Sequence, residues 1–344
     1  MFHVEHLPRK FKKKLGGKHM NRRAFLGTAP AVAFPLFRTM AGGKTVPSTQ
    51  PPSLVGEVLK TDMRISNAAR MEAGENIQKA ADACSARDFA EYVRADAQTA
   101  GKMREKFAIL RYFDDAFSKT AEWIKNGKPR RGEVQLGLVY NMGYVVKTPT
   151  LTFAIDLCHP RAAEIAGNLD FLLITHNHQD HLSQPLISTL KKAGKPIVQN
   201  YMDTPHYSAG NRRFKFGDAT ILTKCCDHNR RLERFVLTYE IDCGKSAGNA
   251  RIFHTGDAYD TKQAVPEREP DVFIPHLAVG LDIPKCATQT IKPKTILMSH
   301  ILELGHEIGK WRWPISLGSE IGQKCGGVPA YTPFWGEVFK VGKS

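Results

Sequence analysis

Four side chains that can bind a metal ion lie within six positions of one another. They follow the apolar run 171–175 and are His176, His178, Asp180 and His181. Neutral imidazole and carboxylate groups suit zinc and related divalent ions. The histidine pair at i and i+2 can point at one ion, while the two residues on the far side of the turn can serve a second. The alternative is a polar loop whose histidines contact solvent or backbone, but four such side chains directly after a buried strand favour a metal centre.

Side chains of the same types recur where other strand-like segments end. His228 follows the segment 221–223, Asp257 follows 251–254, His300 follows 295–299, and Asp156 ends the upstream segment 151–156. Ligand-type residues therefore appear in order at the ends of separate predicted strands.

The motif at residues 176–181 fits the pattern His-x-His-x-Asp-His, and with the later motifs the chain resembles the metallo-β-lactamase-fold hydrolases over residues 133–344. The resemblance implies an αββα four-layer sandwich, with metals held by loops at one edge. It implies one metal bound by His176, His178 and His228, a second bound by Asp180, His181 and His300, and Asp257 as the bridge. It also implies that Asp156 orients the ligand loop. Two divalent ions are expected, with zinc first and manganese or iron as alternatives.

The implied chemistry is hydrolysis by a metal-bound hydroxide. Paired ions lower the pKa of a shared water from 15.7 to about 7 and polarise the attacked carbonyl or phosphoryl oxygen. The expected substrate is therefore a small ester, lactone or phosphodiester, and no covalent enzyme intermediate is required. The candidate catalytic residues are Asp180, His276 and His306. The two histidines follow predicted strand ends, which places them near the metal edge.

The spacing of the motifs indicates which members of this family the chain resembles most. Asp257 stands where several true β-lactamases of this fold carry cysteine, which argues against antibiotic hydrolysis. Only 43 positions separate Asp257 from His300, which leaves no space for the large inserted domain of the nucleic-acid-processing members. The spacing is most similar to the branch that contains ascorbate-6-phosphate lactonase and N-acyl-phosphatidylethanolamine phospholipase D. The resemblance does not extend to the substrate of either enzyme.

Two other functions fit parts of the sequence. The net charge of +15 suggests a nucleic-acid phosphodiesterase. However, residues 1–44 hold ten Lys and Arg against one acidic residue, so +9 of that charge lies in one short segment and argues against nucleic acid as the partner. The other alternative is a non-catalytic module that binds metal or a partner on the same fold, and the complete ligand set weighs against it.

The basic N-terminal segment, residues 1–43, resembles a twin-arginine export signal. Arg22 and Arg23 precede Phe25-Leu26 and a weakly apolar stretch with prolines, and small residues follow at 41–43. The mature protein is expected to be periplasmic or otherwise exported, with transient contact to the export machinery. The alternatives are a disordered basic tail on a cytoplasmic protein, and translation that begins at Met20.

Between this signal and the catalytic region lie a linker, 44–53, and a helical segment, 54–130. Apolar side chains step by three or four along the helical segment in one continuous stripe: Met103, Phe107, Leu110, Phe113, Phe117, Ala121 and Ile124. The stripe predicts packing against the catalytic region, with a substrate-gripping lid as the alternative. Gly127 is the expected stop. No apolar run reaches 18 residues, which excludes a multi-span membrane protein.

The catalytic region, 131–344, is rich in short β-type runs. Strands are predicted over 134–146, 151–157, 171–175, 197–199, 220–224, 235–242, 251–254, 272–275 and 295–299. One helix is expected between a cap at Ser183 and a stop at Gly194. Ser246 lies in a Gly-x-Ser-x-Gly match, but this is a polar link between two strands, so a serine-hydrolase role is not expected. His159, His206 and His254 are expected to be structural or surface residues.

Overall fold

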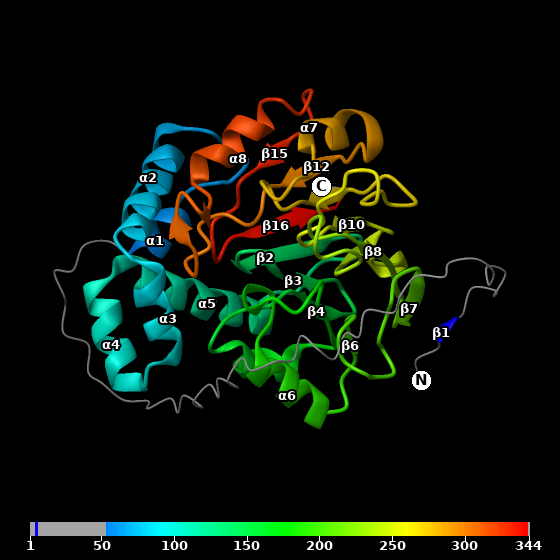
Figure 1. The fold of residues 1–344 in the computed structure, drawn as a ribbon, viewed down its shortest axis with the longest axis horizontal. Helices are drawn as coiled ribbons and strands as arrows, with labels where there is room; N and C mark the ends of the chain where they lie inside the picture. The colour runs from blue at the N-terminus through cyan, green and yellow to red at the C-terminus, as the bar shows by residue number, and fades with distance from the viewer. Residues whose placement is uncertain (1–3, 6–52, 343–344) are drawn as a thin grey trace.

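Two β-sheets packed face to face form the centre of the molecule (Figure 1). The computed structural model describes residues 4–5 and 53–342, so the predicted export signal lies outside the described residues. The first sheet has the order β16 (Val338–Val341), β2 (Val134–Tyr140), β3 (Gly143–Lys147), β4 (Thr152–Ile155), β5 (Phe171–Leu173), β6 (Ile197–Val198). The second has the order β1 (Val4–Glu5), β7 (Arg212–Phe216), β8 (Ala219–Cys226), β9 (Val236–Asp242), β10 (Arg251–His254), β11 (Val272–Ile274), β12 (Thr295–Leu297), β15 (Ala330–Tyr331).

The interface between the sheets is apolar and closely packed. Phe171 of the first sheet stacks on Phe216 of the second, with ring centroids 4.4 Å apart. Tyr239 on β9 reaches across and donates its hydroxyl to the carbonyls of Ile174 and Val198, at 2.6 and 3.0 Å. A buried tyrosine needs such a partner because an unpaired hydroxyl in the core is costly. These contacts fix the two sheets relative to each other.

Helices cover the outer faces of the sandwich, as Figure 1 shows: α6 (Gln184–Lys192) on one side, and α7 (Ile283–Lys285) with α8 (Ile315–Gly322) on the other. The predicted αββα arrangement is therefore confirmed. Helix α6 also has the predicted ends. The Ser183 hydroxyl accepts a bond from the backbone N–H of Leu186, and Gly194 adopts φ +66° just beyond the helix.

The predicted strand 134–146 is wrong as a single element. It is a hairpin of β2 and β3 in which Asn141 turns the chain at φ +55°. Asparagine tolerates this left-handed conformation better than most residues. Both strands are fully buried, so only Asn141 and Gly143 mark the turn in the sequence. Strands β7, β15 and β16, which lie at or near sheet edges, were not predicted.

The helical segment consists of α1 (Leu54–Val58), α2 (Ala68–Asp82), α3 (Ala86–Arg94), α4 (Ala97–Lys106) and α5 (Ala108–Asn126). The predicted stripe is not carried by one continuous helix, because Phe107 leaves helical geometry at φ −116° and ψ 110° and separates α4 from α5. Helix α5 ends at Gly127 as predicted. Among the described helices, none has the length and apolar character needed to cross a membrane.

The helical segment shares its core with the sandwich. Phe113 on α5 packs against Tyr140 of β2 and against Trp335, with ring centroids 5.0 and 5.8 Å apart. Arg70 on α2 forms a buried two-bond ion pair with Glu337, at 2.5 and 2.8 Å. Burial of a phenylalanine side chain is worth about 1.5–3 kcal/mol. The stripe is therefore a packing surface rather than a movable lid.

The two-stranded ribbon β13 (Glu307–Ile308) and β14 (Trp311–Arg312) lies outside both sheets. Arg312 holds it to the helical segment, since its buried guanidinium donates to the carbonyls of Ala81 in the last turn of α2 and of Cys84 just after that helix, at 2.9 and 2.6 Å. The same guanidinium donates to the carbonyls of Leu304 and His306. The ribbon and the loop before it are thus fixed against α2.

Candidate metal centre

The predicted ligands meet where strands of both sheets end. His176 lies three residues beyond β5 of the first sheet. His228, Asp257 and His300 lie beyond β8, β10 and β12 of the second sheet, respectively. Loops at this edge carry the polar side chains because the strands themselves are buried. The structure brings all seven predicted ligand residues to this edge, in two groups.

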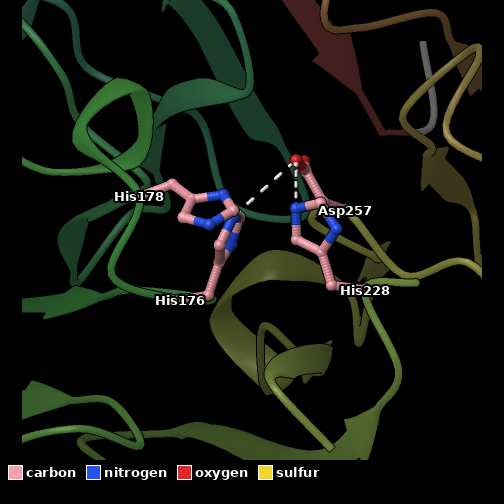
Figure 2. Close-up of side chains that lie close together, drawn as sticks. All are labelled: His176, His178, His228 and Asp257. Atoms are coloured by element: carbon pink, nitrogen blue, oxygen red, sulfur yellow. Dashed lines mark hydrogen bonds and ion pairs between the residues drawn. The ribbon is translucent and has the colours of Figure 1, made fainter. Parts of the chain in front are cut away.

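The first group is His176, His178, His228 and Asp257 (Figure 2). The three rings turn towards one another and towards the carboxylate in the close-up. Oδ2 of Asp257 lies 3.4 Å from Nε2 of His228 and 3.7 Å from Nε2 of His176. Four side chains that offer nitrogen and oxygen atoms within 4.8 Å of one another can hold a divalent ion.

The second group is Asp180, His181 and His300. Oδ2 of Asp180 lies 3.2 Å from Nε2 of His300 and 3.3 Å from Nε2 of His181. Oδ1 of Asp257 lies 3.2 Å from Nε2 of His181. Asp257 therefore reaches both groups, one with each carboxylate oxygen. This is the position that the resemblance implies for a bridging ligand.

Asp156 sets the orientation of two of the imidazole rings. Its carboxylate accepts a bond from Nδ1 of His181 at 2.8 Å, and from the hydroxyl and N–H of Thr175, both at 2.7 Å. Because the Thr175 hydroxyl donates to Asp156, its oxygen accepts from Nδ1 of His176, at 3.0 Å. Each ring then carries a proton on Nδ1 and turns Nε2 towards the other ligands, and Nε2 of His176 also lies 3.0 Å from Nδ1 of His178. Asp156 thus has the orienting role that the resemblance implies.

The charges at the site suit a cation. Burial lowers the pKa of His176 well below its usual range, and burial with the neighbouring His228 lowers that of His178 to about 4, so both rings are neutral ligands at pH 7. Burial raises the pKa of Asp257, but His181, His276 and His300 outweigh it and hold the carboxylate ionised.

The pKa of His181 shifts in the opposite direction to the pKa values of the other two histidines of the motif. Burial lowers its pKa, but Asp257, Asp180 and Asp156 outweigh burial and raise the pKa well above the usual value. Without a metal, a proton on this ring is what neutralises three surrounding carboxylates. A bound cation would take over that task, because buried negative charge requires a partner.

Several buried polar atoms that make no hydrogen bond belong to the two ligand groups. Among the described residues, Nε2 of His181, Nε2 of His228 and Oδ1 of Asp257 are buried and make no hydrogen bond. Such atoms are uncommon in folded proteins because each costs about 1–3 kcal/mol. All three belong to the two ligand groups and face one another, so the residues present fit divalent metal ions.

His276, one of the predicted catalytic residues, lies at the metal edge and stacks on His300 with ring centroids 3.9 Å apart. It forms a group with Asp257 and His300. Its Nδ1 accepts the backbone N–H of Ala278 at 3.0 Å, so the neutral ring carries its proton on Nε2 and is a donor at the site. Nδ2 of Asn229 lies 3.1 Å from Nδ1 of His228, and its Oδ1 accepts the backbone N–H groups of Arg231 and Leu232.

His306 is not part of either ligand group. Its Nδ1 pairs with the buried carboxylate of Glu303, and the hydrogen bond to Glu303 raises the pKa of the ring. Glu303 also accepts from the Tyr140 hydroxyl at 3.1 Å. The ring is 42% exposed, beside the β13–β14 ribbon. His306 therefore lies on the loop that continues from His300, outside the shell of ligands.

Two residues of the centre were missed in the sequence. Asn141, in the β2–β3 turn, donates Nδ2 to Oδ2 of Asp180 at 2.9 Å, and its carbonyl accepts the N–H of His300 at 3.2 Å. Thr175 links Asp156 to His176, as described above. The asparagine followed two positions later by Gly143 is a turn signal that could have divided the run 134–146.

The histidines expected to be structural are in the core or away from the ligands. His254 is buried, donates Nε2 to the Met142 carbonyl at 3.0 Å and accepts the N–H of Gly256 at Nδ1. His159 lies buried against Phe113 and Phe117, and His206 against Phe214 and Phe216. Their contacts supply packing rather than chemistry.

Ser246 lies in the link between β9 and β10, at the start of β10, whereas Asp257 follows the end of that strand. Its N–H donates to Asp218 at 3.1 Å, and its hydroxyl lies 3.1 Å from that of Thr150. No histidine is among these neighbours, so nothing there could activate the serine as a nucleophile.

Comparison with known proteins gives similarity over half of the chain. No protein-family model matches it. The chain is 28% identical over 217 residues to a UPF0173 metal-dependent hydrolase of Anaeromyxobacter dehalogenans strain 2CP-C, covering 50% of this chain and 76% of that protein. A second relative, from strain 2CP-1, is 27% identical over 219 residues with the same coverage.

Solved structures with similar architecture include the metallo hydrolase Igni18 of Ignicoccus hospitalis, with a TM-score of 0.47 and 15% identity over 62% of this chain and 100% of that one. The metallo-β-lactamase-fold protein YhfI of Bacillus subtilis has a TM-score of 0.47 and 14% identity over 61% and 100%. The chain thus has the metallo-β-lactamase fold by its own layers and sheet order, and it is similar in sequence to metal-dependent hydrolases.

Proposed function

We propose that the chain, a metal-dependent hydrolase of the metallo-β-lactamase fold, uses two divalent ions, with zinc as the first candidate, to hydrolyse a small ester, lactone or phosphodiester. The observation that supports this most directly is the Asp156 network, which turns Nε2 of both His176 and His181 towards the two oxygens of Asp257. A site arranged only for packing would not leave Nε2 of His181 and Oδ1 of Asp257 buried without a hydrogen bond.

Asp180 and His276 have separate roles in the proposed reaction. When bound, the ions supply an activated water and polarise the attacked oxygen. Asp180 accepts a bond from Asn141 at Oδ2, which leaves Oδ1 to orient the water and to take its proton. The Nε2–H of His276 can donate to the substrate oxygen on which negative charge develops.

A substrate panel tests this function. Zinc-loaded protein is expected to turn over at least one class among lactones, thioesters and phosphodiesters, with loss of activity in chelator and recovery when zinc is restored. No turnover of any class at full metal occupancy would favour the non-catalytic module. Cleavage of nucleic acid with a steep dependence on salt would favour the nucleic-acid phosphodiesterase.

Export through the twin-arginine pathway is part of the same proposal, because Arg22 and Arg23 precede a weakly apolar core. Wild-type protein, expressed from its own start, is expected outside the cytoplasm, with a mature N-terminus after about residue 40. Replacing both arginines with lysine is expected to hold full-length precursor inside. Fractionation with N-terminal sequencing measures both results. An unaltered chain that stays cytoplasmic and uncleaved would overturn the export proposal.

A further inference from the structure

A groove of about 590 Å³ opens beside the β13–β14 ribbon, a volume within the usual range for small-molecule sites. The residues that line it include Ala86 at the start of α3, His306, Lys310, Trp311 and Trp313. The indole rings of Trp311 and Trp313 lie edge to face with centroids 6.1 Å apart. The groove therefore has two aromatic rings on one wall and the helical segment on the other.

The ribbon exposes apolar side chains that packing does not require. Ile308 and Trp311 are 54% and 55% exposed. Trp311 also adopts φ +78°, a conformation that is a genuine outlier for a bulky residue. Strained backbone of this kind costs about 1–3 kcal/mol and is concentrated at functional sites. The strain here holds a tryptophan at the surface, where its ring contributes nothing to the core.

The position of the groove is rigidly tied to the metal centre. The chain passes from the ligand His300 through Glu303 to His306 in the groove wall, and His300 and Leu302 both have positive φ angles, +64° and +56°. Arg312 clamps the far end of the ribbon with four backbone hydrogen bonds. The groove wall thus includes a residue that follows the ligand His300 by six positions in the chain, and the ribbon beside it is fixed to the rest of the fold.

The charges of the groove nearly cancel. His306 is paired with Glu303, and the exposed Lys310 is offset by Glu307 on the same ribbon. An anionic or cationic ligand would find little net attraction here. Two indoles offer a large, stiff contact area for an uncharged apolar or aromatic group.

We infer that this groove is the binding site for an uncharged apolar or aromatic portion of the substrate, whose hydrolysable bond lies at the metal centre. The class of substrate therefore joins a small reactive group to an apolar extension, such as an acyl chain or an aryl ring. This inference rests on the proposed function for the reactive group, but the groove itself can be tested by binding alone.

The first experiment measures binding of the uncharged fluorescent probe N-phenyl-1-naphthylamine to the full chain, with and without metal. Wild type is expected to bind it at one site per chain, and Trp311→Ala to weaken that affinity at least tenfold. Met71→Ala removes an apolar side chain of similar exposure, 61%, on α2 and is the matched control. Failure of wild type to bind the probe, equal binding by Trp311→Ala, or loss in Met71→Ala alone would overturn the inference.

The second experiment compares esters that differ only in the length of the acyl chain. Wild type is expected to gain at least tenfold in kcat/KM from a two-carbon to an eight-carbon chain, mainly through KM. Trp311→Ala is expected to lose that gain, whereas Met71→Ala is expected to keep both the gain and the kcat for the short ester within about twofold. A preserved gain would contradict the inference. Inactivity towards all esters, with the probe result intact, would count against the proposed reaction and leave the groove standing.

Discussion

His178→Ala and Asp180→Ala are each expected to lower kcat by about a thousandfold or more, a cost of about 4 kcal/mol in the activation barrier. Each substitution removes a side chain from one of the two ligand groups. Asp180 also anchors Asn141 and His300, at 2.9 and 3.2 Å, so its loss disturbs the loop that carries another ligand. Steady-state kinetics on metal-loaded variants, with circular dichroism to check folding, measure the effect.

Ser246→Ala is the matched control for this prediction. Ser246 lies before β10, at the opposite end of that strand from Asp257, and its neighbours are Thr150 and Asp218, so the variant is expected to keep at least half of the wild-type kcat. A folded, metal-loaded Ser246→Ala protein without activity would place the nucleophile on the serine. A His178→Ala protein with a tenth of the wild-type activity or more would remove that ligand from the chemistry.

The kcat of wild-type protein is also expected to depend on pH. The deprotonated form of the activated water attacks, so kcat is expected to rise with pH through about 7 and then level off. His176 and His178 are neutral throughout that range because burial lowers the pKa of both rings, so their protonation would reduce activity only in acid. A flat profile between pH 6 and 9 in metal-loaded protein would contradict the proposed nucleophile.

The second large effect is on the number of metal ions that the protein binds. Wild-type protein prepared without chelators is expected to hold close to two divalent ions per chain, and Asp257→Ala to lose at least one. Asp257 contacts both ligand groups, with Oδ1 near His181 and Oδ2 near His228, so no other residue can take its place. Elemental analysis of the purified proteins measures the stoichiometry.

Thermal unfolding gives a second measurement of the same event. Added zinc is expected to raise the Tm of wild type, since an ion that binds only the folded state stabilises it, and to raise the Tm of Asp257→Ala less. Asp203→Ala, which removes an exposed carboxylate outside both groups, is the control and is expected to match wild type. A wild-type protein without bound metal, or an Asp257→Ala protein that retains two ions, would overturn the assignment of this residue.

The sequence by itself located the residues of the candidate metal centre and predicted the layers of the fold. Ligand-type side chains at strand ends are a local pattern, because a buried strand is apolar and its polar neighbours must lie in the following loop. His176 to His181, His228, Asp257 and His300 could therefore be found in order. The C-terminal end of α5 and both ends of α6 were predicted for the same reason, since caps and glycine stops act over a few residues.

Only the tertiary structure decided how these pieces meet. The turn at Asn141 lies between two buried strands, and although Asn141 and Gly143 mark it, nothing in that short stretch revealed the contact of Asn141 with Asp180. The break at Phe107 left the spacing of the apolar stripe intact. The groove depends on Arg312, whose four acceptors lie in two segments more than two hundred residues apart. Contacts of that range depend on the packing of whole elements, and no short stretch of sequence encodes them.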